Sequence, residues 1–180
     1  YFDFTRGKRA TSFFGDGLVA HISTAEPVCP RLSQSVVESG YKTDIRVHSN
    51  KTYACVEGPR LGTKAESFFL KNSGCHIVGM TNLPEAFLAR EAQLCYCTIA
   101  IVTDFDCWLD DPNQHVTLEK VLALYKQSLD QVKKLLTHVL QTAVSQVTAC
   151  QCRHSLKEAV LTNENSLSGL KRELLRFLKE

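Results

Sequence analysis

The order of hydrophobic and polar residues divides the chain into short apolar runs and longer amphipathic stretches. A short apolar run between turn residues is typical of a buried strand, whereas apolar residues three and four positions apart are typical of a helix. Strands are predicted at residues 18–22, at 44–56 in one or two pieces, at 76–80 and at 96–103. The last run is continuously apolar, as expected for a strand covered on both faces.

Helices are predicted at residues 30–40, 63–74, 83–94, 154–161 and 166–178, with a long helix from Thr117 through Val139. The helix at 63–74 would bury Ala65, Phe68 and Phe69. Pro84 falls in the first turn of its helix, where a missing N–H costs nothing. Alternating strands and helices predict an α/β fold around a mainly parallel sheet. Without an internal repeat or linker, residues 1–180 are expected to form a single domain.

Composition and charge narrow the possible functions. The chain has 180 residues, of which 44% are hydrophobic and 22% charged, as in a soluble globular domain. Its net charge of +2, without a block of Lys and Arg, argues against nucleic acid as a partner. No apolar run has the length of a membrane span and no signal peptide opens the sequence, so we expect a cytoplasmic protein. The first residues, YFDFTRGKR, resemble the middle of a strand, and the only Met of the chain is Met80. We therefore expect the chain to be N-terminally truncated.

The eight cysteines lie mostly inside apolar runs, at positions 29, 55, 75, 95, 97, 107, 150 and 152. Zinc needs four converging ligands, and the spacing of these cysteines along the chain does not supply such a set. We therefore expect buried free thiols and no metal. The alternative is a strained or redox-sensitive pair formed by Cys150 and Cys152.

Chemistry is expected where the predicted strands end, because ligands of α/β sheets bind beyond the carboxyl ends of the strands. At one exit, strand 76–80 runs through Met80 into Thr81, and a helix follows near Pro84. The Thr81 hydroxyl and the free N–H groups of a helix start would suit an anion. The alternative is an ordinary strand–helix turn capped by Thr81.

The second exit is VTDFDCW, in which Thr103 is followed by Asp104 and Asp106. Two carboxylates beside a hydroxyl could act as acid and base, as metal ligands, or as hydrogen-bonding groups for a ligand. A metal would need further converging acidic or His residues, and only the surface-like Asp110 and Asp111 are near in sequence. The alternative is that both carboxylates cap the following turn.

Three stretches, VEGPRLGTKAESF, VGMTNLPEAFLAREAQLCY and IVTDFDCW, closely resemble the 5'-methylthioadenosine phosphorylase branch of the trimeric purine nucleoside phosphorylases. FDFTRGKRATSFFGDG and VAHISTAEPVC fit the same family in the same order. The resemblance runs from residue 1 to about residue 140, and more loosely through CQCRHSLKEAVLT. It implies a three-layer sandwich around a mixed, mainly parallel sheet, and a homotrimer. It also implies phosphorolysis of 5'-methylthioadenosine to adenine and 5-methylthioribose 1-phosphate, with inorganic phosphate as co-substrate and without a metal or organic cofactor.

The resemblance assigns the purine to the second strand end, the stretch from Thr103 to Asp106, which we call the acidic exit. Asp104 matches the residue that meets the purine at N7, where a protonated carboxyl can donate to the leaving base. Asp106 matches the carboxylate that prefers a 6-amino group, and the Thr103 hydroxyl would belong to the same substrate site. Leu61 stands where family members often place a Phe that stacks on the purine.

The same resemblance assigns the rest of the substrate. Met80 matches the residue that lies against the ribose, and Thr81 matches a phosphate-contacting hydroxyl. His21 matches a residue that enters the 5' pocket of a neighbouring subunit, so the site would need a trimer. The apolar wall around the 5' substituent would be formed by Leu118, Val121 and Leu122.

Departures from the family pattern leave alternatives open. Gly62 replaces the Glu of the branch that handles hypoxanthine and guanine, whereas Gly79 stands where the closest methylthioadenosine enzymes have Asn. The family's Gly-rich phosphate loop and Arg-His phosphate contact do not occur in this sequence. The alternatives are a 5'-methylthioinosine or inosine phosphorylase, and a non-catalytic purine-binding fragment that lacks the phosphate loop.

Overall fold

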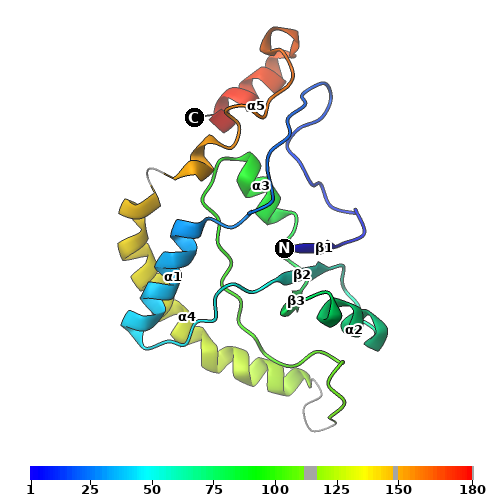
Figure 1. Cartoon of the computed structure of the whole chain (residues 1–180), viewed down its shortest axis with the longest axis vertical. Helices are drawn as coiled ribbons and strands as arrows, with labels where there is room; N and C mark the ends of the chain where they lie inside the picture. The colour runs from blue at the N-terminus through cyan, green and yellow to red at the C-terminus, as the bar shows by residue number, and fades with distance from the viewer. Residues whose placement is uncertain (112–116, 148–149, 180) are drawn as a thin grey trace.

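A computed structural model describes residues 1–111, 117–147 and 150–179 (Figure 1). Its helices are α1 (Pro30–Thr43), α2 (Lys64–Asn72), α3 (Glu85–Glu91), α4 (Leu118–Val147) and α5 (Gly169–Lys179), with 3-10 helices η2 (Gln151–His154) and η3 (Glu164–Ser166). Its strands are β1 (Phe2–Phe4), β2 (Tyr53–Val56) and β3 (Ile77–Gly79). Among the described helices, none is long and apolar enough to cross a membrane.

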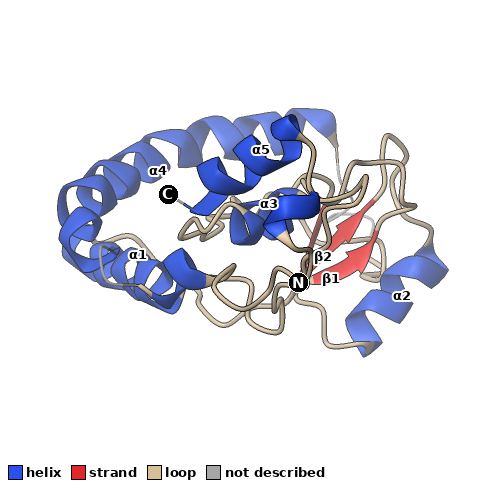
Figure 2. Cartoon of the chain, turned by 90° about the horizontal axis from the view of Figure 1, so that it is seen from above, coloured by secondary structure: helices blue, strands red, loops and turns tan. Residues whose placement is uncertain are grey.

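The three strands form a parallel sheet in the order β1-β2-β3. Phe2 pairs with Ala54, and Ala54 pairs in turn with Val78. Helices cover both faces of this sheet (Figure 2). On one face, Cys55 packs against Ala86 of α3. On the other, the ring of Phe4 contacts Phe69 of α2, with ring centroids 5.9 Å apart. Helix, sheet and helix therefore form three layers, which confirms the predicted α/β class.

A second core lies between α1 and α4, where Val36 packs against Leu135 and Val139. The extended segment at residues 96–103 runs beside this core and contributes Cys97 and Ile99. The alternate residues of this segment face the sheet, since Tyr96 packs against the cluster around Cys55 and Thr98 forms a hydrogen bond with Tyr1. The segment thus alternates between two apolar surroundings, as the sequence predicted. The prediction that it forms a strand is wrong, because the ladder of the described residues contains only β1, β2 and β3.

Two other predicted elements differ from the structure. Residues 18–22 form isolated bridges, one of which joins Ala20 to Val160, instead of a regular strand. The predicted helix at 154–161 is wrong, because the chain makes only the short helix η2 and then turns toward that bridge. This arrangement places Leu18 in a small core with Leu175 of α5.

Helix α2 begins with a capping box, which explains its position directly after the β2 exit. The Thr63 side chain accepts a hydrogen bond from the Glu66 N–H, and the Glu66 carboxylate accepts one from the Thr63 N–H. The same carboxylate forms an ion pair with Arg60 at 2.6 Å. The Arg60 guanidinium and the Thr63 N–H together lower the pKa of Glu66 from 4.5 to about 2.

We expect acid to destabilise the protein partly through Glu66. A carboxyl group whose pKa is lower in the folded state contributes stability above its unfolded pKa, and this contribution disappears as the pH falls toward the folded pKa. Urea unfolding should therefore show a loss of stability from about pH 4.5 down to pH 2 that is smaller in Glu66→Gln. Glu26→Gln, at an exposed loop position, is the control and should keep the pH dependence of the unsubstituted protein. Equal pH dependence in Glu66→Gln would contradict this role.

Candidate active site

The exits of β2 and β3 lie at the same edge of the sheet, because parallel strands end on the same side. Met80 follows β3 and lies against Gly58, which follows β2. A Cβ atom at Gly58 would be only 2.8 Å from the Met80 sulfur, so a larger residue there would displace Met80. Gly79 is equally constrained, because a Cβ atom at this position would collide with the Tyr53 hydroxyl. The departure from Asn at position 79 is therefore linked to Tyr53 in this chain.

Thr81 lies in the turn between β3 and α3 and is exposed. It does not cap α3, because the N-cap is Pro84 and has no capping side-chain hydrogen bond. The capping alternative for Thr81 is therefore wrong. The helix start was also predicted to favour an anion. This contribution is reduced, because α3 has only seven residues and carries the negatively charged Glu85 in its first turn.

Polar contacts that sequence reasoning missed hold this turn in place. The buried Asn82 accepts hydrogen bonds from the Tyr96 hydroxyl at 2.9 Å and the Thr98 hydroxyl at 2.7 Å. Arg9 donates to the Leu83 carbonyl at 2.5 Å and to Glu57 at 3.2 Å. Arg9 thereby links the exits of β2 and β3. The sequence signal for the role of Arg9 was Glu57, the carboxylate in VEGPR that directly follows the predicted strand ending at Val56. A partly buried carboxylate needs a cation nearby.

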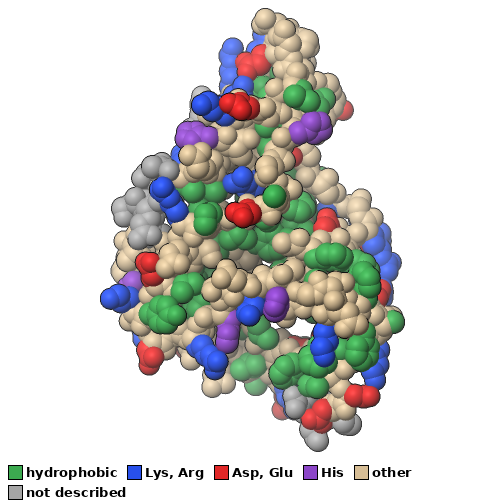
Figure 3. Space-filling view, in the orientation of Figure 1, with side chains coloured by type: hydrophobic (Ala, Val, Ile, Leu, Met, Phe, Trp, Pro, Cys, Tyr) green, Lys and Arg blue, Asp and Glu red, His purple; other side chains and the backbone are tan. Residues whose placement is uncertain are grey.

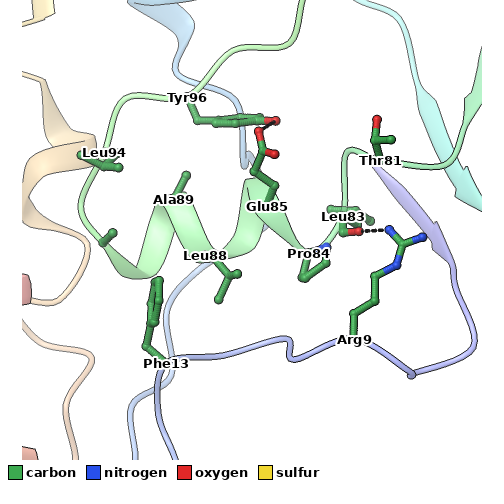
Figure 4. A pocket seen from close by; sticks show the side chains of 11 residues that line it. Arg9, Phe13, Thr81, Leu83, Pro84, Glu85, Leu88, Ala89, Leu94 and Tyr96 are labelled. Carbon is green, nitrogen blue, oxygen red and sulfur yellow. Dashed lines mark hydrogen bonds between the residues drawn. The ribbon is translucent and has the colours of Figure 1, made fainter. Parts of the chain in front are cut away.

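A hollow of about 630 Å³ opens beside this turn, along α3 (Figure 4). Its wall is mostly apolar, with Leu88, Phe13 and Leu94, and its polar residues include Arg9 and Thr81 (Figure 4). Of the predicted site residues, Thr81 is the one that lines this hollow. The described chain alone therefore does not enclose the predicted residues in one cavity.

The two carboxylates of the acidic exit have different surroundings. Asp104 is exposed and accepts a hydrogen bond from the Thr103 hydroxyl at 2.5 Å. Asp106 accepts one from the Ser67 hydroxyl of α2 at 2.6 Å and one from the Cys107 N–H at 2.8 Å. Asp106 thus connects the acidic exit to α2 and also accepts from the N–H of the following residue, whereas Asp104 is left facing solvent beside Thr103.

Ser67 contacts the acidic exit, and the sequence did not reveal this contact. It is buried on α2, where it also accepts a hydrogen bond from the Trp108 N–H at 3.1 Å. The predicted burial of Ala65, Phe68 and Phe69 is wrong, because all three are exposed. Ser67 and Leu70 are buried instead. At the buried position 67, the helix thus presents a hydroxyl group that binds the loop at Asp106 and Trp108.

Aromatic and charged contacts further fix the loop after Asp106. The Lys71 ammonium lies 3.3 Å from the centre of the Trp108 ring, a cation–π contact. Phe105 meets the same ring edge-on, with centroids 6.2 Å apart. Asp110 forms an exposed ion pair with Lys64 at 3.0 Å. The acidic exit is therefore held along α2, with Asp104 at its start.

Most of the remaining predicted residues are exposed in the single chain. Leu61 is 73% exposed and Leu118 is 74% exposed, while Val121 is half-buried on the first turn of α4. Leu122 beside it is also exposed. His21 lies elsewhere, in a segment whose backbone bonds to Ala159, so the chain does not bring it to the acidic exit. Its expected role in a neighbouring subunit stays a prediction.

Fold and site together define an α/β protein with acidic and hydroxyl side chains where its strands and extended segment end. Residues 2–141 match the family model described as the phosphorylase superfamily, so the chain belongs to this superfamily. It is 43% identical over 159 residues to S-methyl-5'-thioadenosine phosphorylase of Nitrosopumilus maritimus, covering 88% of this chain and 59% of the relative. It is 37% identical over 178 residues to the enzyme of the same name from Geobacter sulfurreducens, covering 99% and 62%.

Solved structures give the same result. A methylthioadenosine phosphorylase from an antarctic soil metagenomic library superposes with a TM-score of 0.90 at 34% identity, covering 98% of this chain and 62% of the other. Methylthioadenosine phosphorylase from Schistosoma mansoni in complex with adenine superposes with a TM-score of 0.78 at 30% identity, covering 88% and 63%. This chain thus spans about three-fifths of the length of these relatives.

Proposed function

We propose that the protein cleaves 5'-methylthioadenosine with inorganic phosphate, releasing adenine and 5-methylthioribose 1-phosphate. The observation that carries this proposal is the TM-score of 0.90 with a methylthioadenosine phosphorylase over 98% of the chain. A phosphorylase of this kind works in purine and methionine salvage. It needs phosphate as co-substrate, and no metal or organic cofactor takes part in the reaction.

In the proposed reaction, a phosphate oxygen bonds to the anomeric carbon of the ribose while the bond from that carbon to purine N9 breaks. The bonding electrons pass into the purine, and a carboxyl group that donates its proton to N7 neutralises them. Asp104 is assigned this role because it stands at the start of the acidic exit, where a bound purine can reach it and Thr103 orients its carboxyl group. The ribosyl group carries positive charge in the transition state, between phosphate and the leaving base.

Selectivity for adenine is assigned to Asp106. A carboxylate offers about four lone-pair positions, and Asp106 uses two of them for Ser67 and the Cys107 N–H. The others can accept hydrogen bonds from a 6-amino group. Hypoxanthine presents a 6-oxygen instead, and two acceptors facing each other are unfavourable.

Ribose, phosphate and the 5' substituent are assigned to the remaining residues. Met80 would lie against the ribose, the Thr81 hydroxyl would donate to phosphate, and Leu61 would lie against the purine. The 5' methylthio group would contact the apolar residues on the first turns of α4, namely Leu118, Val121 and Leu122. The exposure of Leu61, Leu118 and Leu122 in the single chain suits surfaces that a substrate or another chain covers.

We further propose that the protein is a cytoplasmic homotrimer in which His21 of one subunit completes the 5' pocket of the next. Hydrophobic side chains reach the surface in several places (Figure 3), including Tyr125 and Leu140 of α4 and Phe69 of α2. Surfaces of this kind favour contacts between subunits.

A chromatographic assay of base release tests the proposed function. With phosphate present, the purified protein should release adenine from 5'-methylthioadenosine, and it should release hypoxanthine from 5'-methylthioinosine at least about 100-fold more slowly. Omitting phosphate should stop the reaction. Faster release of hypoxanthine would favour the inosine-type alternative, which Gly79 supports. Calorimetric binding of adenine by folded protein that releases neither base would overturn the enzymatic function and favour the non-catalytic alternative.

A further inference from the structure

Four cysteine sulfur atoms meet at one point of the described chain. Cys29, Cys95, Cys150 and Cys152 place their Sγ atoms within 4.8 Å of one another. They come from three separate segments: the N-cap of α1, the segment between α3 and the extended residues 96–103, and the start of η2 after α4. Spacing along the chain did not predict this convergence, so the expectation that no set of four thiols comes together is wrong.

The separations of the sulfur atoms fit a tetrahedral metal centre better than disulfides. The Sγ atoms of Cys29 and Cys150 are 3.5 Å apart. Four thiolates at about 2.3 Å from a zinc ion lie about 3.8 Å from one another, whereas a disulfide needs about 2.05 Å. All four cysteines are free thiols. Shifts of less than about 1 Å would bring the four sulfur atoms to zinc distances.

The surroundings of the cluster resemble those of a structural metal site. Cys29, Cys150 and Cys152 are buried, and Leu32 packs against them. The Leu32 N–H, in the first turn of α1, donates to the Cys29 sulfur at 3.4 Å. N–H groups at a helix start stabilise thiolates, the form of cysteine that binds metal. Four thiolates that meet at one buried point need a cation to compensate their charge.

We propose that Cys29, Cys95, Cys150 and Cys152 bind one zinc ion as a structural site. Zinc would displace up to four thiol protons to solvent, and four thiolates around Zn²⁺ leave a net charge of −2. All four coordination positions belong to the protein, which leaves none for a substrate and marks a structural role. The ion would join the start of α1, the segment that leads to Asp104 and the chain after α4 at one point.

Metal analysis of the whole purified protein tests this site. Protein reduced under anaerobic conditions, given equimolar Zn²⁺ and desalted should retain about one zinc ion per chain by mass spectrometry of the elements. Titration with Co²⁺ should produce the visible bands of tetrahedral cobalt and the charge-transfer absorption of four thiolates. Added Zn²⁺ should remove these bands. Failure to retain zinc and to produce the cobalt bands, in folded protein with eight free thiols, would overturn the proposal.

Two substitutions with matched controls locate the site. Cys29→Ser and Cys152→Ser should each lower zinc affinity by about 10-fold or more and weaken the thiolate absorption of the cobalt form. Cys75→Ser and Cys107→Ser, which lie outside the cluster, should retain zinc as the unsubstituted protein does. Equal zinc affinity in all four variants would refute the site.

The remaining outcomes are also decisive. If the cluster variants do not fold, the cobalt spectrum of the unsubstituted protein still reports the number of thiolate ligands. Disulfides between these cysteines in protein purified with zinc and without oxidant, seen as a mass lower by about 2 Da per bond, would support the redox-pair alternative and overturn zinc binding. Base release plays no part in any of these measurements, so the site and the proposed function can fail independently.

Discussion

Replacing Asp104 by Asn should lower kcat/KM for phosphorolysis of 5'-methylthioadenosine by about 10²- to 10⁴-fold, the usual loss when a general acid is removed. Asn keeps the size of the side chain and an oxygen that can accept the hydrogen bond of Thr103, so the loop should keep its conformation. It cannot transfer a proton to purine N7. The loss should therefore appear mainly in kcat, measured by adenine release at saturating substrate and phosphate.

The control for this prediction is Asp110→Asn. Asp110 belongs to the same acidic stretch but pairs with Lys64 at the surface, with its side chain 82% exposed. Its substitution should leave kcat/KM within about twofold, since exposed ion pairs contribute little. Equal losses in the two variants would mean that Asp104 acts only through the general charge of the loop. Unchanged activity of Asp104→Asn would remove Asp104 from the proposed mechanism.

Asp106→Asn should change selectivity more than rate. Ser67 can still donate to the amide oxygen of the new side chain, which keeps the loop attached to α2, although the hydrogen bond from the Cys107 N–H is lost. The amide nitrogen, however, would now face the 6-position of the purine as a donor. The preference for adenine over hypoxanthine should therefore shrink, whereas Asp104→Asn should lower both rates alike.

The parts of the fold that local pattern determines could be predicted from the sequence. The strand at Ile77–Gly79 and the long helix that follows Thr117 depend on their own apolar periodicity, and both were found. Residues 96–103 show the limit of this reasoning. Their alternation was correct, but strand formation needs a neighbouring strand to pair with, and periodicity carries no information about the neighbour.

The site was predictable at the level of which residues end the strands, and less so in their contacts. Asp104 and Asp106 look alike in the sequence, yet a buried serine on α2 separates their surroundings. Nothing in the local pattern connects Ser67 to a loop 39 positions later. The four cysteines are a second case, because their convergence depends on how three distant segments fold together.

Replacing Leu135 by Ala should destabilise the protein by about 2–5 kcal/mol, the range measured when a large buried side chain is truncated and leaves a cavity. Leu135 is 2% exposed and fills the interface between α1 and α4 together with Val36 and Val139. Ile99 packs against the same cluster, so a cavity there would also loosen the extended segment that leads to Asp104. Urea unfolding followed by circular dichroism measures the loss.

Leu140→Ala tests whether this effect comes from burial. Leu140 is on the same helix and loses the same atoms, but it is 70% exposed, so its truncation creates no internal cavity. The free energy of unfolding should change by no more than about 0.5 kcal/mol, as at other exposed positions. If Leu140 instead lies in a contact between subunits, its variant should lose stability only at protein concentrations where the unsubstituted protein is oligomeric. A loss equal to that of Leu135→Ala at every concentration would contradict a core between α1 and α4 that is closed within one chain.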